Sequence, residues 1–181
     1  MQKGMMLKLL AVCIVTSLAV CAISGCNSVS RAAAQETDKA RLQRLEDREE
    51  IRQLTMDYGR FLDKRDWASF SRLFAEKDGE WTGGMGSAKG PQAIRKLMED
   101  TIGKGSGAAS SPNFHIFTNQ IINPDGDRAT ATTKWMFVVQ GSDNRPQTVF
   151  LGHYDDSMVR ENGSWKFQRR VVYGDIPPDK K

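Results

Sequence analysis

The run TVFLGHYDDSMVRENGSWKFQRRVV, residues 148–172, decides the fold of this chain. Apolar and polar residues alternate on both sides of its centre, Glu161-Asn162-Gly163. Asn-Gly between two alternating runs is the strongest short-range signal of a β-hairpin. We therefore predict two antiparallel strands, over residues 148–160 and 165–172.

The same period-two pattern occurs earlier in the chain, over residues 115–122 and 128–139. The segment between these two runs, Asn123-Pro124-Asp125-Gly126-Asp127, is typical of a tight turn. Its acidic residues resemble part of a calcium loop but lack the remaining ligands, so we interpret it as a turn. Together the four runs predict an antiparallel meander.

Helical periodicity precedes the meander. A long helix is predicted over residues 38–62, and a short one over 67–75 follows Asp66, a residue suited to an N-cap. A third begins at Pro91, after a glycine-rich loop or bent strand edge at 83–90. The apolar stripe of the long helix comprises Leu42, Leu45, Ile51, Leu54, Tyr58, Phe61 and Leu62. Three helices followed by a meander predict an α+β fold, with the helices on one face of a curved, mostly antiparallel sheet.

The first 25 residues have the pattern of a secretory signal. Lys3 and Lys8 precede an almost wholly apolar run over residues 9–23, which is too short to span a bilayer comfortably. Ile23-Ser24-Gly25-Cys26 resembles the lipobox of bacterial lipoproteins, which implies cleavage before Cys26 and lipidation of its thiol. We expect a signal peptide at 1–25, a flexible tether at 26–37, one domain at 38–177 and a tail at 178–181.

This reading predicts a location in the cell envelope, with the membrane as a partner through the lipid on Cys26. In a Gram-negative host, Asn27 in place of aspartate resembles sorting to the outer membrane, facing the periplasm. Cys13 and Cys21 lie in the predicted signal, so the domain is left without a disulfide, a thiolate metal site or a cysteine nucleophile. The formal net charge of +4 forms no basic stripe with interleaved aromatics, so nucleic-acid binding is not indicated.

The sequence has two histidines, His115 and His153, both in predicted strands. Asp63 lies at the end of the long predicted helix, where an anion opposes the helix dipole. It either pairs with Lys64 or Arg65 at the surface or orients His115 as a general base, because a carboxylate fixes the imidazole tautomer.

The chain from about residue 45 to 177 resembles the SnoaL-like members of the nuclear transport factor 2-like superfamily. The resemblance rests on fragments in the family's order: residues 51–58, 61–66, 73–75, 90–94, 115–119, 126–129, 152–155 and 163–167. It implies a cone-shaped α+β barrel with an apolar pocket at its mouth. The branch most similar in motif comprises scytalone dehydratase, the bile acid dehydratases and hexachlorocyclohexane dehydrochlorinase, which use no metal or organic cofactor.

The resemblance also implies roles for individual residues. Asp63 and His115 match a catalytic aspartate–histidine pair, Tyr58 matches a pocket tyrosine and Arg160 aligns with a pocket arginine. Substrate contacts are expected from Arg170, where many relatives have an arginine, from His153, which has no secure counterpart, and from Trp81 and Trp135 in the pocket wall. The alternatives are that Tyr58 belongs to the core and that Arg160 is an exposed strand residue.

We therefore expect a cofactor-independent lyase or isomerase, in which Asp63 and His115 act as the general base on a small, largely apolar substrate. Two other classes stay open at this point. One is a non-catalytic envelope lipoprotein that binds a hydrophobic small molecule. The other is a module that forms homo-oligomers, dimers or trimers, through the open face of its sheet. An Asp63–His115 pair inside a closed pocket would favour the enzyme over the other two classes.

Overall fold

The computed structural model describes residues 37–103 and 112–178. The predicted signal peptide, Cys26 and almost all of the tether lie outside these residues. The chain divides into two compact units, Met1–Leu45 and Glu46–Lys181. In the first unit, residues 37–45 are helical, and Leu42 and Leu45 are exposed although the apolar pattern placed them on the stripe. None of the helices in the described part of the chain is long and apolar enough to cross a membrane.

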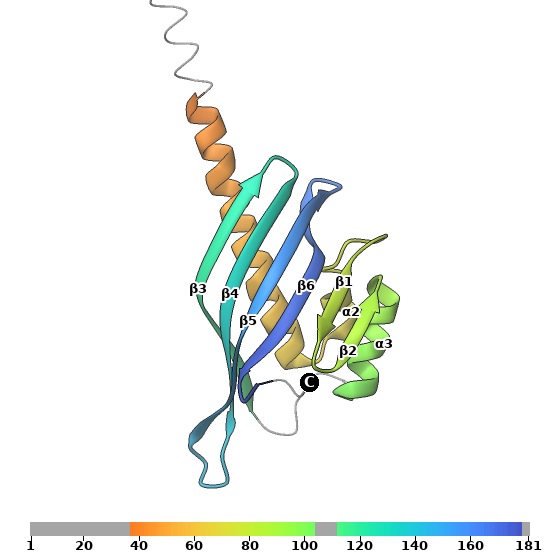
Figure 1. Ribbon diagram of the computed structural model, residues 1–181, viewed down its shortest axis with the longest axis vertical. Coiled ribbons are helices and arrows are strands. Elements are labelled where there is room, and N and C mark those ends of the chain that lie inside the picture. Colours follow the sequence, from red (N-terminus) through yellow and green to blue (C-terminus); the bar gives the residue numbers. More distant parts are fainter. Residues whose placement is uncertain (1–36, 104–111, 179–181) are drawn as a thin grey trace, which may run out of the picture. The chain divides into compact units, whose positions relative to one another are not determined.

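The second unit has the predicted α+β class (Figure 1). Its helices are residues 46–64, α2 (Trp67–Ser71) and α3 (Pro91–Thr101). Its long strands are β3 (Asn113–Asp125), β4 (Arg128–Gln140), β5 (Pro146–Glu161) and β6 (Ser164–Ile176). All four long strands pair antiparallel in sequence order, which confirms the meander.

Two short strands were not predicted. β1 (Glu80–Gly83) and β2 (Gly86–Lys89) form a hairpin in the segment that was interpreted as a loop or bent edge. β1 pairs parallel with β6, so the six-stranded sheet has the order β2-β1-β6-β5-β4-β3. The short second helix was predicted to reach residue 75, but it ends at Ser71. The chain beyond it is drawn to the sheet, where Phe74 bridges to Phe167 and the Ala75 amide donates to the Phe167 carbonyl.

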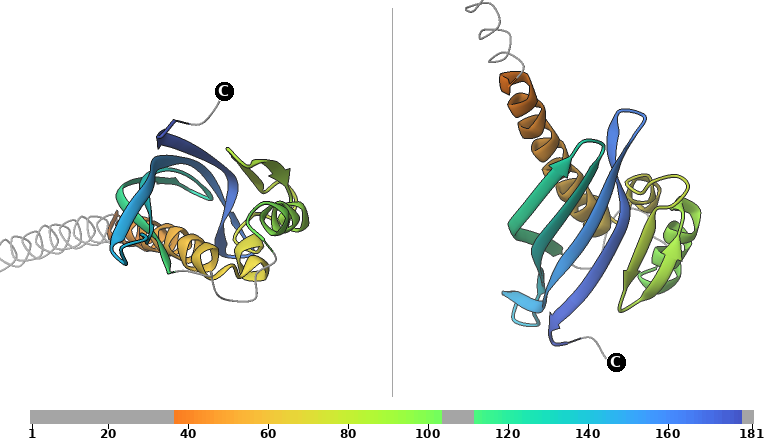
Figure 2. Two further views of the ribbon diagram at one scale, coloured as in Figure 1. Left: turned by 90° about the horizontal axis from the view of Figure 1, so that it is seen from below. Right: turned by 45° about the horizontal axis from the view of Figure 1, so that its top comes forward.

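The sheet curls around the helix of residues 46–64, and the core fills its concave face (Figure 2). Ile51, Leu54 and Tyr58 recur every three to four residues on that helix, and all three are buried. From the sheet, period-two alternation brings Ala129, Ala131 and Trp135 of β4 to the same core, together with residues from β5 and β6. The strands therefore divide cleanly into an inner face and an outer face.

Candidate active site

A sharply terminated helix sets the position of Asp63. The Arg65 amide donates to the Leu62 carbonyl, and the Asp66 amide donates to the Phe61 carbonyl. Arg65 adopts a φ of 54°, so these two bonds form the motif that usually ends a helix at a glycine. Asp66 then caps α2 by accepting a 3.0 Å hydrogen bond from the Ser69 amide. Asp63 is thereby held in the last turn, next to β3.

Asp63 and His115 are in direct contact. Asp63 Oδ1 lies 2.5 Å from His115 Nδ1, and Asp63 Oδ2 accepts a 3.0 Å bond from the His115 backbone amide. Asn113 donates a third bond, 3.0 Å, to Oδ1. The side chains of His115 and Asp63 are only 13% and 20% exposed. The alternative of a surface ion pair between Asp63 and Lys64 or Arg65 is therefore wrong, since the carboxylate faces β3.

The geometry fixes the tautomer of His115. A carboxylate only accepts hydrogen bonds, so the proton between Asp63 and His115 resides on Nδ1. This leaves Nε2 with its lone pair, and His115 lines a cavity of about 340 Å³. Phe137 packs against the imidazole with a centroid separation of 4.7 Å, which holds the ring in place. The arrangement suits abstraction of a proton by a general base.

The cavity is lined mainly by apolar and aromatic side chains. Tyr58, Trp81, Trp135 and Tyr154 contribute from the helix of residues 46–64, β1, β4 and β5. The remaining lining residues are Leu62, Gly84, Met85, Met98, Ile102, His115, Phe137, Phe150, Val172 and Gly174. Trp81 and Trp135 thus lie in the pocket wall as predicted, and no lysine, arginine, aspartate or glutamate is in this set.

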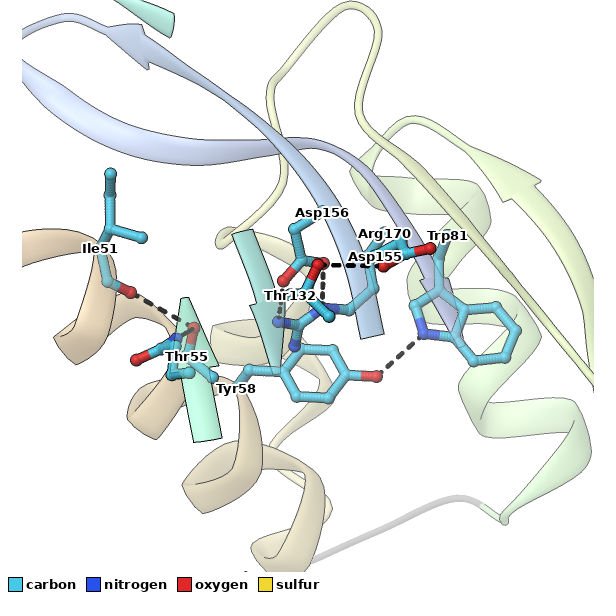
Figure 3. A network of polar contacts seen from close by, with 9 residues as sticks. Ile51, Thr55, Tyr58, Trp81, Thr132, Asp155, Asp156 and Arg170 are labelled. Carbon is cyan, nitrogen blue, oxygen red and sulfur yellow. Dashed lines mark hydrogen bonds and ion pairs between the residues drawn. The ribbon is translucent and has the colours of Figure 1, made fainter. Parts of the chain in front are cut away.

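Tyr58 lines the cavity and also belongs to the hydrophobic core. The expectation of a pocket tyrosine and the alternative of a core residue therefore both describe it. Its hydroxyl oxygen accepts a 2.9 Å hydrogen bond from Trp81 Nε1 (Figure 3). Burial is the main cause that raises the pKa of Tyr58, and the nearby Arg170 lowers it. The phenol is therefore neutral at ordinary pH and retains its own proton to donate.

Arg170 does not line the cavity, which corrects the expectation that it contacts substrate. It is wholly buried and donates two 2.7 Å hydrogen bonds to Asp156, from Nε and Nη2 (Figure 3). Its guanidinium carbon lies 4.0 Å from the ring centroid of Tyr58 and 4.2 Å from that of Tyr154. Arg170 therefore supports the two tyrosine rings from behind.

His153 is also outside the pocket, and strand alternation is the reason. Its neighbours in β5, Gly152 and Tyr154, line or face the concave side, so His153 must face outward. There it contacts Asp175 through Nδ1 at 2.9 Å and stacks on Tyr173. The expected substrate contact is corrected to an outer-face histidine–aspartate pair.

Arg160 lies at the end of β5, next to the β5–β6 turn, and is absent from the cavity lining. It pairs with Asp47, with Glu50 at 3.3 Å and with Asp127 at 3.5 Å, and its guanidinium lies over the Trp165 ring. The expected pocket position is therefore corrected to a structural ion-pair cluster that joins the helix to two turns.

Sequence reasoning missed two residues of this site, Asn113 and Tyr154. Asn113 lies two positions before His115, so period-two alternation alone places it on the same face. Tyr154 lies two positions after Gly152 and could have been found in the same way. Among the described residues, no group of three or more His, Cys, Asp or Glu side chains could hold a metal ion.

Comparison with known proteins defines the class. Residues 43–171 match the SnoaL-like domain model, and the chain belongs to this family. An uncharacterized protein of Mycobacterium tuberculosis is 30% identical over 132 residues, covering 70% of this chain and 84% of that protein.

Two solved structures from Novosphingobium aromaticivorans are similar. One, an NTF2-like protein with a cystatin-like fold, is 29% identical with a TM-score of 0.63, covering 74% of this chain and 84% of that one. The other, proposed to be a scytalone dehydratase, is 25% identical with a TM-score of 0.59, covering 72% and 85%. The predicted family and fold are thus confirmed.

Proposed function

We propose that this protein is a cofactor-independent lyase or isomerase that removes a proton from carbon in a small, neutral, largely apolar substrate. The observation that carries the proposal is the Asp63–His115 pair, whose histidine lines an apolar pocket. The similarity to the protein proposed to be a scytalone dehydratase supports the same class. A pair facing solvent would have favoured a binding protein instead.

The reaction begins at His115. Nε2 takes a proton from a substrate carbon, and Asp63 stabilises the imidazolium that forms. In an elimination, the electron pair of the broken C–H bond forms a carbon–carbon double bond while hydroxide or chloride departs. In an isomerisation, the electron pair is delocalised and another carbon of the substrate takes the proton back from His115. Tyr58 donates its hydroxyl proton in a hydrogen bond to the oxygen or leaving group. Asn113 holds the Asp63 carboxylate in place.

Deuterium exchange tests this proposal without the natural substrate. We would follow by NMR the loss of α-protons from a panel of cyclic ketones in D₂O, and elimination from matched hydroxy and chloro compounds. The expected result is exchange or elimination that falls about 10²–10⁴-fold in His115→Ala, the usual contribution of a general base. Asp63→Asn should lower the rate as well, because it no longer holds the productive tautomer.

His153→Ala is the matched control, because it removes a histidine that also contacts an aspartate but lies on the outer face. It should leave the rate unchanged. If His115→Ala and Asp63→Asn retained the wild-type rate while His153→Ala did too, proton abstraction by this pair would be excluded, and a ligand-binding role would be favoured.

We further propose that the protein is exported and held on the envelope membrane by a lipid on Cys26. The support is the sequence of residues 1–26 alone. Labelling with a palmitate analogue and fractionation should show a lipidated protein in the membrane fraction. Cys26→Ser should lose the label, and equal labelling of both forms would contradict the proposal.

Self-association is proposed through the outer face of the sheet. Ile116, Met136, Leu151 and Ile176 pair in one row across β3 to β6. Ile116 and Ile176 are 44% and 62% exposed, which is costly for an isolated surface. Sedimentation should show a dimer or trimer that Ile116→Lys dissociates. A wild-type monomer at high concentration would contradict it.

A further inference from the structure

The residues that line the cavity divide into a buried group and an exposed group. Tyr58, Trp135 and Met98 belong to the buried group. Met85 and Phe150 also line the cavity, but they are 39% and 42% exposed. Large side chains that line a cavity and are also exposed to solvent mark the place where it opens. The open end of the cavity therefore lies between the β1–β2 turn, which carries Met85, and the part of β5 that carries Phe150.

Met85 and Phe150 lie on opposite sides of β6, near Gly174. β1 runs parallel to β6 and pairs with it as far as Val171, so the turn that follows β1 lies beside the residues that follow Val171. On the other side of β6, Gly174 pairs with Gly152 of β5, and Phe150 is two residues before Gly152 on the same face. Gly174 lines the cavity without a side chain, so it leaves the space between Met85 and Phe150 free for a ligand.

Glycines hold the turn that carries Met85 against the cavity wall. A Cβ added at Gly83 would lie 2.8 Å from Trp81 and 2.9 Å from Val172, so the close approach of the turn to these two lining residues requires glycine. Gly86 follows Met85 with a φ of 122°, a conformation that side-chain-bearing residues rarely adopt. The fold therefore fixes the shape of the turn and places Met85 at the cavity.

The two exposed side chains favour a ligand that reaches the open end of the cavity. A ligand that ended inside the cavity would leave Met85 and Phe150 in water, whereas one that extended between them would cover both. Each CH₂ group that such a ligand buries raises its affinity about 4-fold. Among the described residues, the lining includes no lysine, arginine, aspartate or glutamate that could pair with a charged end. The part of the ligand at the open end is therefore apolar.

We propose that Met85 and Phe150 are specificity-determining residues, which bind the apolar end of an elongated substrate where it leaves the cavity. The inference rests on the proposed function for the orientation of the substrate, in which the carbon that loses its proton lies at His115. It narrows the substrate class to neutral molecules with an apolar part long enough to extend from His115 to the space between Met85 and Phe150.

The test uses 4-alkylphenols with unbranched tails of two to eight carbons, which are neutral and differ only in length. Their dissociation constants would be measured by competition with the fluorescent apolar probe N-phenyl-1-naphthylamine. In the wild type, affinity should rise about 4-fold for each CH₂ that the protein covers. In Met85→Ala and in Phe150→Ala, the shortest phenol should bind as in the wild type, and the longest should bind about 3- to 10-fold more weakly, the loss expected when one or two CH₂ groups are left uncovered.

Phe114→Ala is the matched control for Phe150→Ala, because Phe114 is 60% exposed and does not line this cavity. It should bind every phenol as the wild type does. Met85 and Phe150 are exposed, so their alanine variants should fold as well as the wild type, and thermal unfolding checks this. The proposal would be overturned if neither variant weakened the longest phenol more than the shortest, if Phe114→Ala showed the same loss, or if no phenol bound the wild type.

The outcome is separable from that of the proposed function, because binding and proton transfer are measured apart. His115→Ala should keep the length dependence of the wild type while it loses deuterium exchange. If His115→Ala keeps both, the general base is wrong, and a selective loss of the longest phenol in Met85→Ala and Phe150→Ala still supports their binding role. If those two variants keep the wild-type length dependence while His115→Ala loses exchange, the general base stands and the role of Met85 and Phe150 is wrong.

Discussion

Removal of Asp156 should destabilise the protein more than any substitution of a surface charge. Asp156 and Arg170 have fully buried side chains, and two 2.7 Å hydrogen bonds join them. Breaking one partner of a buried ion pair typically lowers stability by ~3–5 kcal/mol, because the other charge stays in the interior. Domains of this size have a total stability of ~5–15 kcal/mol, so Asp156→Ala removes a large part of it.

The stabilities of the two single variants of this ion pair, Arg170→Met and Asp156→Ala, should depend differently on pH. In Arg170→Met, the stranded Asp156 carboxyl can take up a proton, whereas the guanidinium stranded in Asp156→Ala cannot lose one. Burial already raises the pKa of Asp156 and Arg170 opposes this, so loss of Arg170 raises that pKa further. The folded state then binds this proton more tightly than the unfolded state, and stability falls as pH rises from the unfolded pKa through the raised folded one. The deficit of Arg170→Met should therefore be smaller at pH 5 than at pH 8. The deficit of Asp156→Ala should not increase with pH in this way, because this variant lacks the carboxyl group that takes up the proton.

Urea unfolding at pH 5 and pH 8, followed by tryptophan fluorescence, measures both effects. The double variant Asp156→Leu/Arg170→Met should recover much of the loss, since it leaves no stranded charge. Lys96→Ala is the control: its pair with Asp100 is exposed and screened by solvent, so its removal should change stability far less than Asp156→Ala does. A loss below ~1 kcal/mol in Asp156→Ala, or an Arg170→Met deficit equal at both pH values, would refute this reasoning.

Three further predictions follow from single features. Gly59→Ala, which would stabilise an unconstrained helix by ~1 kcal/mol, should lower stability by ~1–3 kcal/mol in thermal unfolding, because its Cβ would lie 2.5 Å from the Phe117 ring. Above pH ~10 the free energy of unfolding should fall by up to ~1.4 kcal/mol per pH unit for each buried tyrosine, because the phenol loses its proton in the unfolded state first. Tyr154→Phe should reduce this slope, and a slope equal to that of the wild type would contradict the prediction. Arg160→Leu should lower stability by ~1–3 kcal/mol without changing deuterium exchange, and a loss of exchange would place Arg160 in the chemistry after all.

Local patterns predicted most of the fold. The Asn-Gly turn and alternation over residues 148–172 specify β5 and β6, because each pairs with its neighbour in sequence. β1 and β2 were not predicted, because β1 pairs with a strand that is distant in the sequence. Their segment is short and rich in glycine, and β1 is held by parallel pairing with β6, more than 80 residues away. A contact between residues so far apart in the chain produces no regular alternation in the local sequence from which the strand could be predicted.

The site was predicted as far as its chemistry follows from residue type. Asp63 and His115 were paired because the resemblance to SnoaL-like proteins matches them to a catalytic aspartate–histidine pair, and because a carboxylate can orient an imidazole as a general base. His153 was misplaced because residue type does not say which face of a strand a side chain takes. Arg160 has the same parity in β5 as the inward-facing Tyr154, but it lies at the turn end of the strand and is absent from the cavity lining. Counting by twos from His115 and from Gly152 would have placed Asn113 and Tyr154 inward and His153 outward, once the inner face was known.

The buried arginine explains how a neutral pocket can host charge separation. Under the proposed reaction, a proton moves from carbon to His115, so a cation forms beside Asp63 while negative charge forms on the substrate oxygen. Arg170 does not meet that oxygen directly, because Asp156 neutralises it and the tyrosine rings cover it. It instead packs on the ring of Tyr58, whose hydroxyl can donate to the oxygen. Among the described residues, the cavity lining contains no arginine or lysine that could stabilise the negative charge on the substrate oxygen. The imidazolium of His115 therefore depends on Asp63, and the oxygen depends on the Tyr58 hydroxyl, so loss of either group should slow proton transfer.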